Sequence, residues 1–212
     1  MALRPSTNLF LTLMLNLLAI FSPMAMASDA DILTDFNLPP NVSNVDATFF
    51  TYTAARSLVG AQPPTALNFL FADKTSFPAL DGQSVSLAVL RMPGGAVNPP
   101  HSHPRATELL LLISGYLEVG FIDSTNKLFN QTLNAGDMYV FPKGLVHYQF
   151  NYAPDVPAIA VSAFGSANPG LVSIPSNLFQ TDIEDRILAW SFKTDIPTIQ
   201  RIKASVQGSP QA

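Results

Sequence analysis

The sequence predicts an all-β fold, a single-domain double-sheet jelly roll followed by two C-terminal helices. The first indication is a run of short segments rich in Val, Leu, Ile, Phe and Tyr, separated by Gly, Pro, Asn and Asp, which continues to residue 164. The second is composition, since 48% of the 212 residues are hydrophobic and only 12% are charged, enough for one packed core. The third is the capping-box pattern of residues 181–184, which marks a change to helix.

The strands are expected in close succession. Residues 29–46 are polar with Pro39-Pro40 in their middle, so an irregular arm lying on the domain is expected there. One or two strands should lie between Thr48 and Phe77, and no helix is expected before Phe164. The clearer strands are Ser84 to Met92, Thr107 to Ile113, Tyr116 to Ile122, Leu128 to Leu133, Met138 to Phe141, Leu145 to Tyr152 and Ala158 to Phe164.

Two helices are predicted after the strands. The first begins at the capping box of residues 181–184, and the second runs from near Pro197 and ends before Gly208. Apolar residues share one face of each helix: Ile183, Ile187 and Leu188 in the first, Ile199 and Ile202 in the second. This helical pair is either an oligomer contact or packs on its own barrel.

Residues 1–27 are predicted to be an export signal. Arg4 supplies the positive start, residues 9–21 the apolar run and Ala25-Met26-Ala27 a cleavage site of small residues. The run spans thirteen residues, fewer than the roughly 20 of a membrane-spanning helix, so no membrane anchor is expected. The mature chain would be one domain of residues 28–212.

Charge and cysteine content limit which partners, cross-links and metal ligands are expected. The net charge is −4 and the 11 Lys and Arg residues are scattered singly, which argues against binding nucleic acid. There is no cysteine, so neither disulfides nor thiolate ligands contribute. Two sequons, beginning at Asn41 and Asn130, are candidate sites for N-glycans on a secreted protein.

All three histidines fall in one strand-rich stretch. His101 and His103 stand two apart, so on extended backbone their side chains leave the same face. Glu108 precedes four leucines, where a buried carboxylate needs a partner. His147 alternates with Gln149 and Asn151 on a polar face inside an apolar strand, typical of a lined cavity. Each histidine alone is more often hydrogen-bonded structure than a ligand, but together with Glu108 the three predict a metal site.

These residues also fit two motifs of fixed spacing and resemble the cupin family. Within the cupins, residues 98–108 and 142–151 are similar to the germin and germin-like proteins of plants. The first motif is matched by Gly95, His101, His103, Glu108 and Gly115, the second by Gly136, Pro142, Gly144, His147 and Asn151.

The resemblance implies a germin-like cupin domain of type 1, a single jelly-roll β-barrel that is exported to the apoplast and cell wall. It also implies glycosylation, a hexamer built as a trimer of dimers, and one Mn²⁺ per chain held by His101, His103, Glu108 and His147. Three imidazoles and one carboxylate suit such an ion, and Zn²⁺ or Fe²⁺ remain alternatives.

The chain departs from germins in two places. It lacks their two N-terminal cysteines, with Asn37 near the place of the first, so its arm must be held differently. Of the two asparagines that hold oxalate in germins, one corresponds to Asn98 and the other to Ala88, so little or no oxalate oxidase activity is expected. Asn98 is either a substrate contact or a turn residue before Pro99-Pro100.

Three functions remain open from the sequence. A manganese site of this kind could dismutate superoxide. Alternatively, the metal could be structural, in a non-enzymatic wall, storage or receptor-like protein that binds a partner or a small ligand such as auxin. A third alternative is another metallo-cupin reaction, such as that of an isomerase or dioxygenase.

Overall fold

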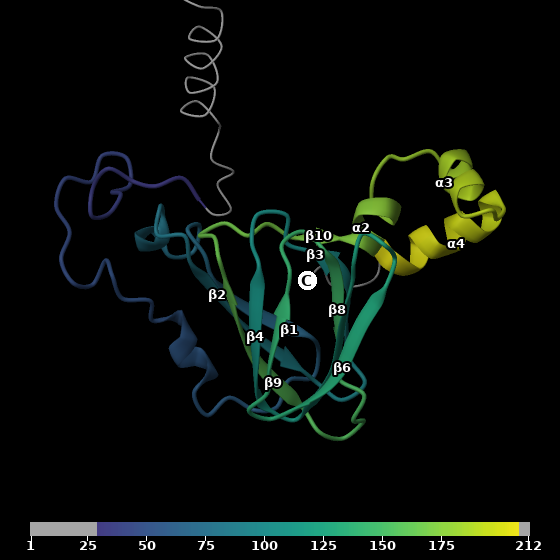
Figure 1. Cartoon of the computed structure of the whole chain (residues 1–212), viewed down its shortest axis with the longest axis horizontal. Helices are drawn as coiled ribbons and strands as arrows, with labels where there is room; N and C mark the ends of the chain where they lie inside the picture. Colours follow the sequence, from purple (N-terminus) through teal and green to yellow (C-terminus); the bar gives the residue numbers. More distant parts are fainter. Residues whose placement is uncertain (1–28, 208–212) are drawn as a thin grey trace, which may run out of the picture.

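Within residues 29–207, which the computed structural model describes, ten strands form two five-stranded antiparallel sheets that face each other (Figure 1). One sheet has the order β1-β2-β9-β4-β7 and the other β10-β3-β8-β5-β6. This arrangement confirms the predicted all-β jelly roll. The strands are β1 Asn68–Ala72, β2 Ser86–Met92, β3 Val97–Ser102, β4 Glu108–Ser114, β5 Tyr116–Ile122, β6 Leu128–Asn134, β7 Met138–Phe141, β8 Val146–Phe150, β9 Ala158–Phe164 and β10 Val172–Ser173.

The observed strands agree with the prediction except where the pattern is interrupted. All of the clearer predicted strands are present, and β1 is the additional strand expected before residue 77. β3 was expected only as the extended segment that carries His101 and His103; its start was not predicted because it contains Pro99-Pro100, and it ends at Ser102, before His103. β10 was not predicted because it has only two residues. Two short 3-10 helices, η1 Ala54–Leu58 and η2 Pro78–Leu80, lie where no helix was expected.

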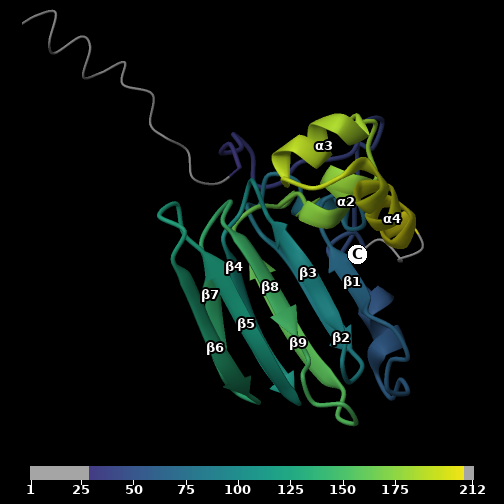
Figure 2. The same cartoon turned by 90° about the vertical axis from the view of Figure 1, so that its right-hand side faces the viewer.

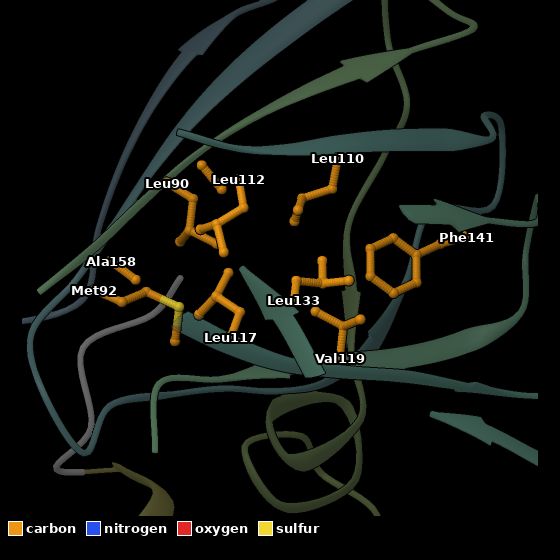
Figure 3. Close-up of a cluster of buried hydrophobic side chains, with 10 residues drawn as sticks. Leu90, Met92, Leu110, Leu112, Leu117, Val119, Leu133, Phe141 and Ala158 are labelled. Carbon is orange, nitrogen blue, oxygen red and sulfur yellow. The ribbon is translucent and has the colours of Figure 1, made fainter. Parts of the chain in front are cut away.

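The hydrophobic core lies between the two sheets (Figure 3). Every second residue of β4 points inward, which buries Leu110 and Leu112 completely. Burying one such leucine stabilises the fold by about 1.5–3 kcal/mol. The other members of this cluster are Leu90, Met92, Leu117, Val119, Leu133, Phe141, Ala158 and Ala160.

Three helices follow β10 and lie beyond one end of the barrel (Figure 2): α2 Ile174–Phe179, α3 Asp185–Ser191 and α4 Ile196–Gln207. Helix α2 packs against β3, and α3 packs on α4 around Leu188, Ala189 and Ile199. Helix α4 begins at Ile196, next to Pro197, so the predicted start of the second helix is confirmed. Helix α2 was not predicted because it is short and begins next to a proline.

The start predicted for the first C-terminal helix is wrong. Helix α3 begins at Asp185, and its N-cap Glu184 makes no side-chain capping hydrogen bond. The Thr181 hydroxyl instead donates to the carbonyl of Asn177 in α2, and the Glu184 carboxylate pairs with Arg186. Both side chains of the expected capping box are thus used elsewhere.

The N-terminal arm lies on the barrel without regular structure, as expected. The Asp29 carboxylate accepts a hydrogen bond from the backbone N–H of Ala167 (2.6 Å), and the Asn37 side chain donates to Asp81 (3.1 Å). Hydrogen bonds therefore hold the arm in a chain that has no cysteine. The predicted export signal lies outside the described residues. No helix among residues 29–207 has the length and apolar character needed to cross a bilayer.

Candidate metal centre

The structure brings the four residues predicted as metal ligands into one buried cluster. His101 lies on β3 directly opposite His147 on β8, while Glu108 begins β4 in the other sheet. His103 follows the end of β3. One donor atom of each side chain lies within 4.8 Å of those of the other three. The cluster lies at the end of the barrel next to α2, because β10 pairs with His101 and leads directly into α2.

Backbone carbonyls orient all three imidazoles. The Nδ1 atoms of His101 and His147 lie 2.8 Å from the carbonyls of Pro99 and Leu145, each two residues upstream. His103 Nδ1 lies 2.5 Å from the carbonyl of Gly170. A carbonyl oxygen only accepts hydrogen bonds, so each Nδ1 carries a proton and Nε2 is the nitrogen left to bind a metal. This is the orientation that metal-binding histidines have in proteins.

The Glu108 carboxylate completes the donor set. Its Oε2 lies 3.1 Å from Nε2 of His147 and 3.3 Å from Nε2 of His103. Burial by itself raises the pKa of this carboxyl group, but the hydrogen bonds from His103 and His147, and the charges of those rings, outweigh it and hold the pKa well below its usual range. Glu108 is therefore ionised.

His101 is kept neutral. Burial, and to a smaller extent the charges of His147 and His103, lowers the pKa of its imidazole to about 3, although the Pro99 carbonyl and Glu108 oppose this. A neutral imidazole is the form that binds a metal.

The donor chemistry fits a divalent cation. Metal–ligand bonds of about 2.0–2.2 Å place neighbouring ligand atoms about 3 Å apart in a regular coordination sphere. The distances from Glu108 Oε2 to the two histidine nitrogens are of this size. Three nitrogens and one carboxylate oxygen suit Mn²⁺, Fe²⁺ or Zn²⁺.

A small cavity of about 20 Å³ adjoins the cluster. Beyond the ligands its wall is mostly apolar, with two neutral amides and one hydroxyl and without any Lys or Arg. Both positions that correspond to the germin substrate asparagines, Ala88 and Asn98, face it. The lining residues are Phe69, Phe71, Ala88, Leu90, Asn98, His101, His103, Glu108, Gln149, Ser162, Phe164 and Leu171.

Asn98 reaches the cavity through a β-bulge. It pairs with Gln149 and His101 pairs with His147, so three steps along β3 match two along β8. Simple alternation would point Asn98 and His101 to opposite faces, but the extra residue at Pro99-Pro100 leaves both side chains buried. The Asn98 amide donates to Gln149 Oε1 (2.6 Å). The turn interpretation of Asn98 is therefore wrong, because the residue lies within β3.

Comparison with known proteins agrees with this geometry. A family model described as Cupin matches residues 64–200. Germin-like protein 9-3 of Oryza sativa subsp. japonica is 54% identical over 204 residues, covering 92% of this chain and 95% of that protein. The chain belongs to the cupin family, in its germin-like branch. Germin-like protein subfamily 2 member 1 of Arabidopsis thaliana is 36% identical over 212 residues, covering 93% of this chain and 96% of that protein.

A solved structure of oxalate oxidase resembles this germin-like cupin throughout the barrel. It is 31% identical, covers 86% of this chain and 100% of that chain, and gives a TM-score of 0.74. This likeness supports the barrel fold that encloses the histidine and glutamate cluster.

Several motif positions of the germin-like cupin shape the backbone rather than the chemistry. Gly115 has a φ of +83°, and a Cβ there would lie 2.6 Å from the carbonyl of Pro157, so the turn between β4 and β5 requires glycine. The Asn151 side chain is buried and donates to the carbonyls of Met92, Pro93 and Val156. Asn151 therefore stabilises the loop after β2.

Two polar residues of the cavity wall did not enter the predicted site. Gln149 was predicted only as part of a polar strand face. In the structure it lines the cavity and accepts a hydrogen bond from Asn98. Ser162 was missed altogether. The sequence indicates it only weakly, by a single hydroxyl among the inward positions of an otherwise apolar strand.

Proposed function

We propose that this germin-like cupin is an exported Mn²⁺ protein of the apoplast that dismutates superoxide and has little or no oxalate oxidase activity. The observation that supports this most directly is the buried cluster of three histidines and one ionised carboxylate beside a small cavity. Bound manganese would supply one-electron redox chemistry, converting two superoxide ions and two protons into oxygen and hydrogen peroxide.

The residues of the chain have three tasks in this proposal. His101, His103, Glu108 and His147 hold the ion. The carbonyls of Pro99, Leu145 and Gly170 fix the imidazole rings through Nδ1, so that Nε2 is the atom directed at the ion. The apolar wall formed by Phe69, Phe71, Phe164 and their neighbours limits access to small molecules.

The cavity favours superoxide over oxalate. Its wall contains no Lys or Arg that could pair with the two carboxylates of oxalate. Ala88 offers no donor where a second amide would hold oxalate, and losing one hydrogen bond to a charged group costs about 1.5–3 kcal/mol. Robust oxalate-dependent release of peroxide by the purified protein would contradict this part of the proposal.

The competing function is a non-enzymatic wall, storage or receptor-like protein with a structural metal. The retention of all four ligands together with the loss of a substrate residue at Ala88 is the observation that favours it. In this case the metal would stabilise the fold by mass action and have no catalytic role.

The test is the rate of superoxide dismutation per bound manganese. The secreted protein is dialysed exhaustively, its metals are identified by mass spectrometry, and its rate is compared with that of free Mn²⁺. Glu108→Gln should lose both metal and activity, whereas the control Glu118→Gln, which removes a carboxylate bonded to Tyr148, should keep both. Bound manganese with no activity above the free ion would favour the structural alternative.

Export, glycosylation and assembly are part of the proposal. Cleavage after Ala27 would start the mature chain at Ser28, which N-terminal sequencing of secreted protein would detect. Asn41 and Asn130 are both exposed, so both sequons are accessible to N-glycans. Light scattering is expected to give the mass of a hexamer, and the exposed Trp190 and Phe192 of the helical pair are available for subunit contacts.

A further inference from the structure

Ser162 is a buried polar residue on an otherwise apolar strand wall. The inward positions of β9 are Ala158, Ala160, Ser162 and Phe164, and all four are buried. Ser162 lies between Ala88 of β2 and Leu110 of β4 in the same sheet. Its two neighbours in the wall therefore offer no side-chain hydrogen-bonding group, and its hydroxyl is directed to Glu108.

The two oxygens of the Glu108 carboxylate have different surroundings. Oε2 lies among the histidine nitrogens, 3.1 Å from His147 Nε2 and 3.3 Å from His103 Nε2. Oε1 is turned to the opposite side and accepts a hydrogen bond from the Ser162 hydroxyl (2.6 Å). One oxygen thus faces the metal position and the other is held by the wall of the sheet.

We propose that Ser162 is a positioning residue that makes Glu108 a one-oxygen metal ligand and keeps its second oxygen away from the ion. A short hydrogen bond to an ionised acceptor is stronger than one between neutral groups. If the bond were absent, rotation of the carboxylate would allow both oxygens to bind. That would use a coordination position which a small ligand from the cavity needs.

This inference rests on the metal site of the proposed function but not on superoxide as its substrate. It assigns a role to a residue outside the cupin motif positions described above. Loss of a hydrogen-bonding partner of a metal ligand typically weakens metal binding 10–100-fold. Ser162→Ala is therefore expected to bind Mn²⁺ about 10–100-fold more weakly than the unmodified protein.

The experiment uses the full mature protein reconstituted with Mn²⁺. Affinity is measured by competition with a chelator, and coordination by the Mn²⁺ electron paramagnetic resonance spectrum. Ser162→Ala should change both, and Ser162→Cys, which has similar size but a weak donor, should change both in the same direction. Ser162→Thr keeps the hydroxyl and should restore the spectrum and an affinity within a few-fold of the original.

Ser86→Ala is the matched control. Ser86 is also buried, and its hydroxyl donates to the carbonyl of Ser166 (2.7 Å) and not to a metal ligand. Its loss should lower the thermal stability of the metal-free protein, as the loss of Ser162 should, but leave the spectrum unchanged. This separates a general cost of removing a buried hydroxyl from an effect on the metal.

The outcomes distinguish this inference from the proposed function. An unchanged spectrum and affinity in Ser162→Ala and Ser162→Cys would overturn the role of Ser162 even if both variants were less stable. A Ser162→Thr protein that behaves like the alanine variant would overturn it as well, because the hydroxyl would not be the cause. If the unmodified protein retained no manganese, the proposed metal function would fail first.

Discussion

The interior of the barrel has two ends with opposite character, and the same strands build both. On β4, Glu108 belongs to the metal centre, whereas Leu110 and Leu112, two and four residues further on, belong to the apolar core. On β9 the order is reversed along the chain, with Ala160 in the core and Ser162 in the cavity wall.

On β4 and β9 the difference between the two ends lies in residue type. Inward positions alternate regularly along both strands. At the core end these positions hold large apolar side chains that pack on one another. At the metal end small or polar residues such as Ala88 and Asn98 leave space, and Phe141 marks the boundary by stacking on His147, with ring centroids 4.4 Å apart. Stability and chemistry should therefore respond to different substitutions.

The largest expected effect on stability is at the core end. Leu112→Ala removes a completely buried side chain and should lower the unfolding free energy by about 2–5 kcal/mol. The neighbouring Ile113 points outward, and Ile113→Ala should change the unfolding free energy by less than about 1 kcal/mol. Urea unfolding of metal-free protein measures both. A loss of manganese affinity in folded Leu112→Ala would show that the two ends are coupled.

The next effect concerns the metal end. Manganese at 100 times its dissociation constant should stabilise the fold by about 2.7 kcal/mol. In Glu108→Gln, which keeps the side-chain volume, this increment should disappear at the same metal concentration, while Glu118→Gln should retain it. Thermal unfolding with and without Mn²⁺ provides the comparison. An increment that survives in Glu108→Gln would mean that the ion binds elsewhere.

A pH dependence should also originate at the metal end. In the unfolded chain His101 takes up a proton below about pH 6.5, but in the folded protein its pKa is about 3. The unfolded state therefore binds more protons between these values, and the metal-free protein should lose stability as the pH falls from 6.5 to 5, by up to about 1.4 kcal/mol per pH unit.

Urea unfolding in the presence of a chelator at pH 7, 6 and 5 measures this slope. His101→Asn removes the titrating group and should give a flatter dependence. An identical slope in the variant would assign the effect to other residues.

The smallest effect is expected outside both ends, in the arm. Asn37→Ala removes the hydrogen bond to Asp81 and should cost about 0.5–1.5 kcal/mol, with manganese affinity unchanged. The exposed Asn44 provides a control, since Asn44→Ala should have almost no effect. Urea unfolding and limited proteolysis of the arm test this. Equal behaviour of the two variants would show that Asn37 does not hold the arm.

Strand alternation made most of the barrel predictable. The bounds of β5, β7 and β9 were predicted without error, because apolar alternation ends at glycine, proline or aspartate on both sides. β3 was predicted only around His101, because its two prolines look like a break, although β8 pairs with residues on both sides of them. The helix ends were less predictable, since Thr181 and Glu184 could also bond to neighbours other than the backbone of α3.

The site was predictable to the extent that it follows fixed spacing. The four candidate ligands lie at motif positions, and the structure brings them together. The position of Asn98 depends on a bulge that alternation does not reveal. Ser162 has no motif, and its importance becomes visible only when β9 is placed beside β4 and its hydroxyl meets Glu108.

The prolines of β3 have a further consequence for the energetics of metal binding. Pro99 and Pro100 have fixed φ angles and no N–H, so these two positions of the bulge have no backbone donor that needs a partner. They also reduce the number of conformations that this segment can adopt in the unfolded chain. Little conformational entropy then remains to be lost when the ion arrives, and the ligand strand is organised for binding before any metal is present.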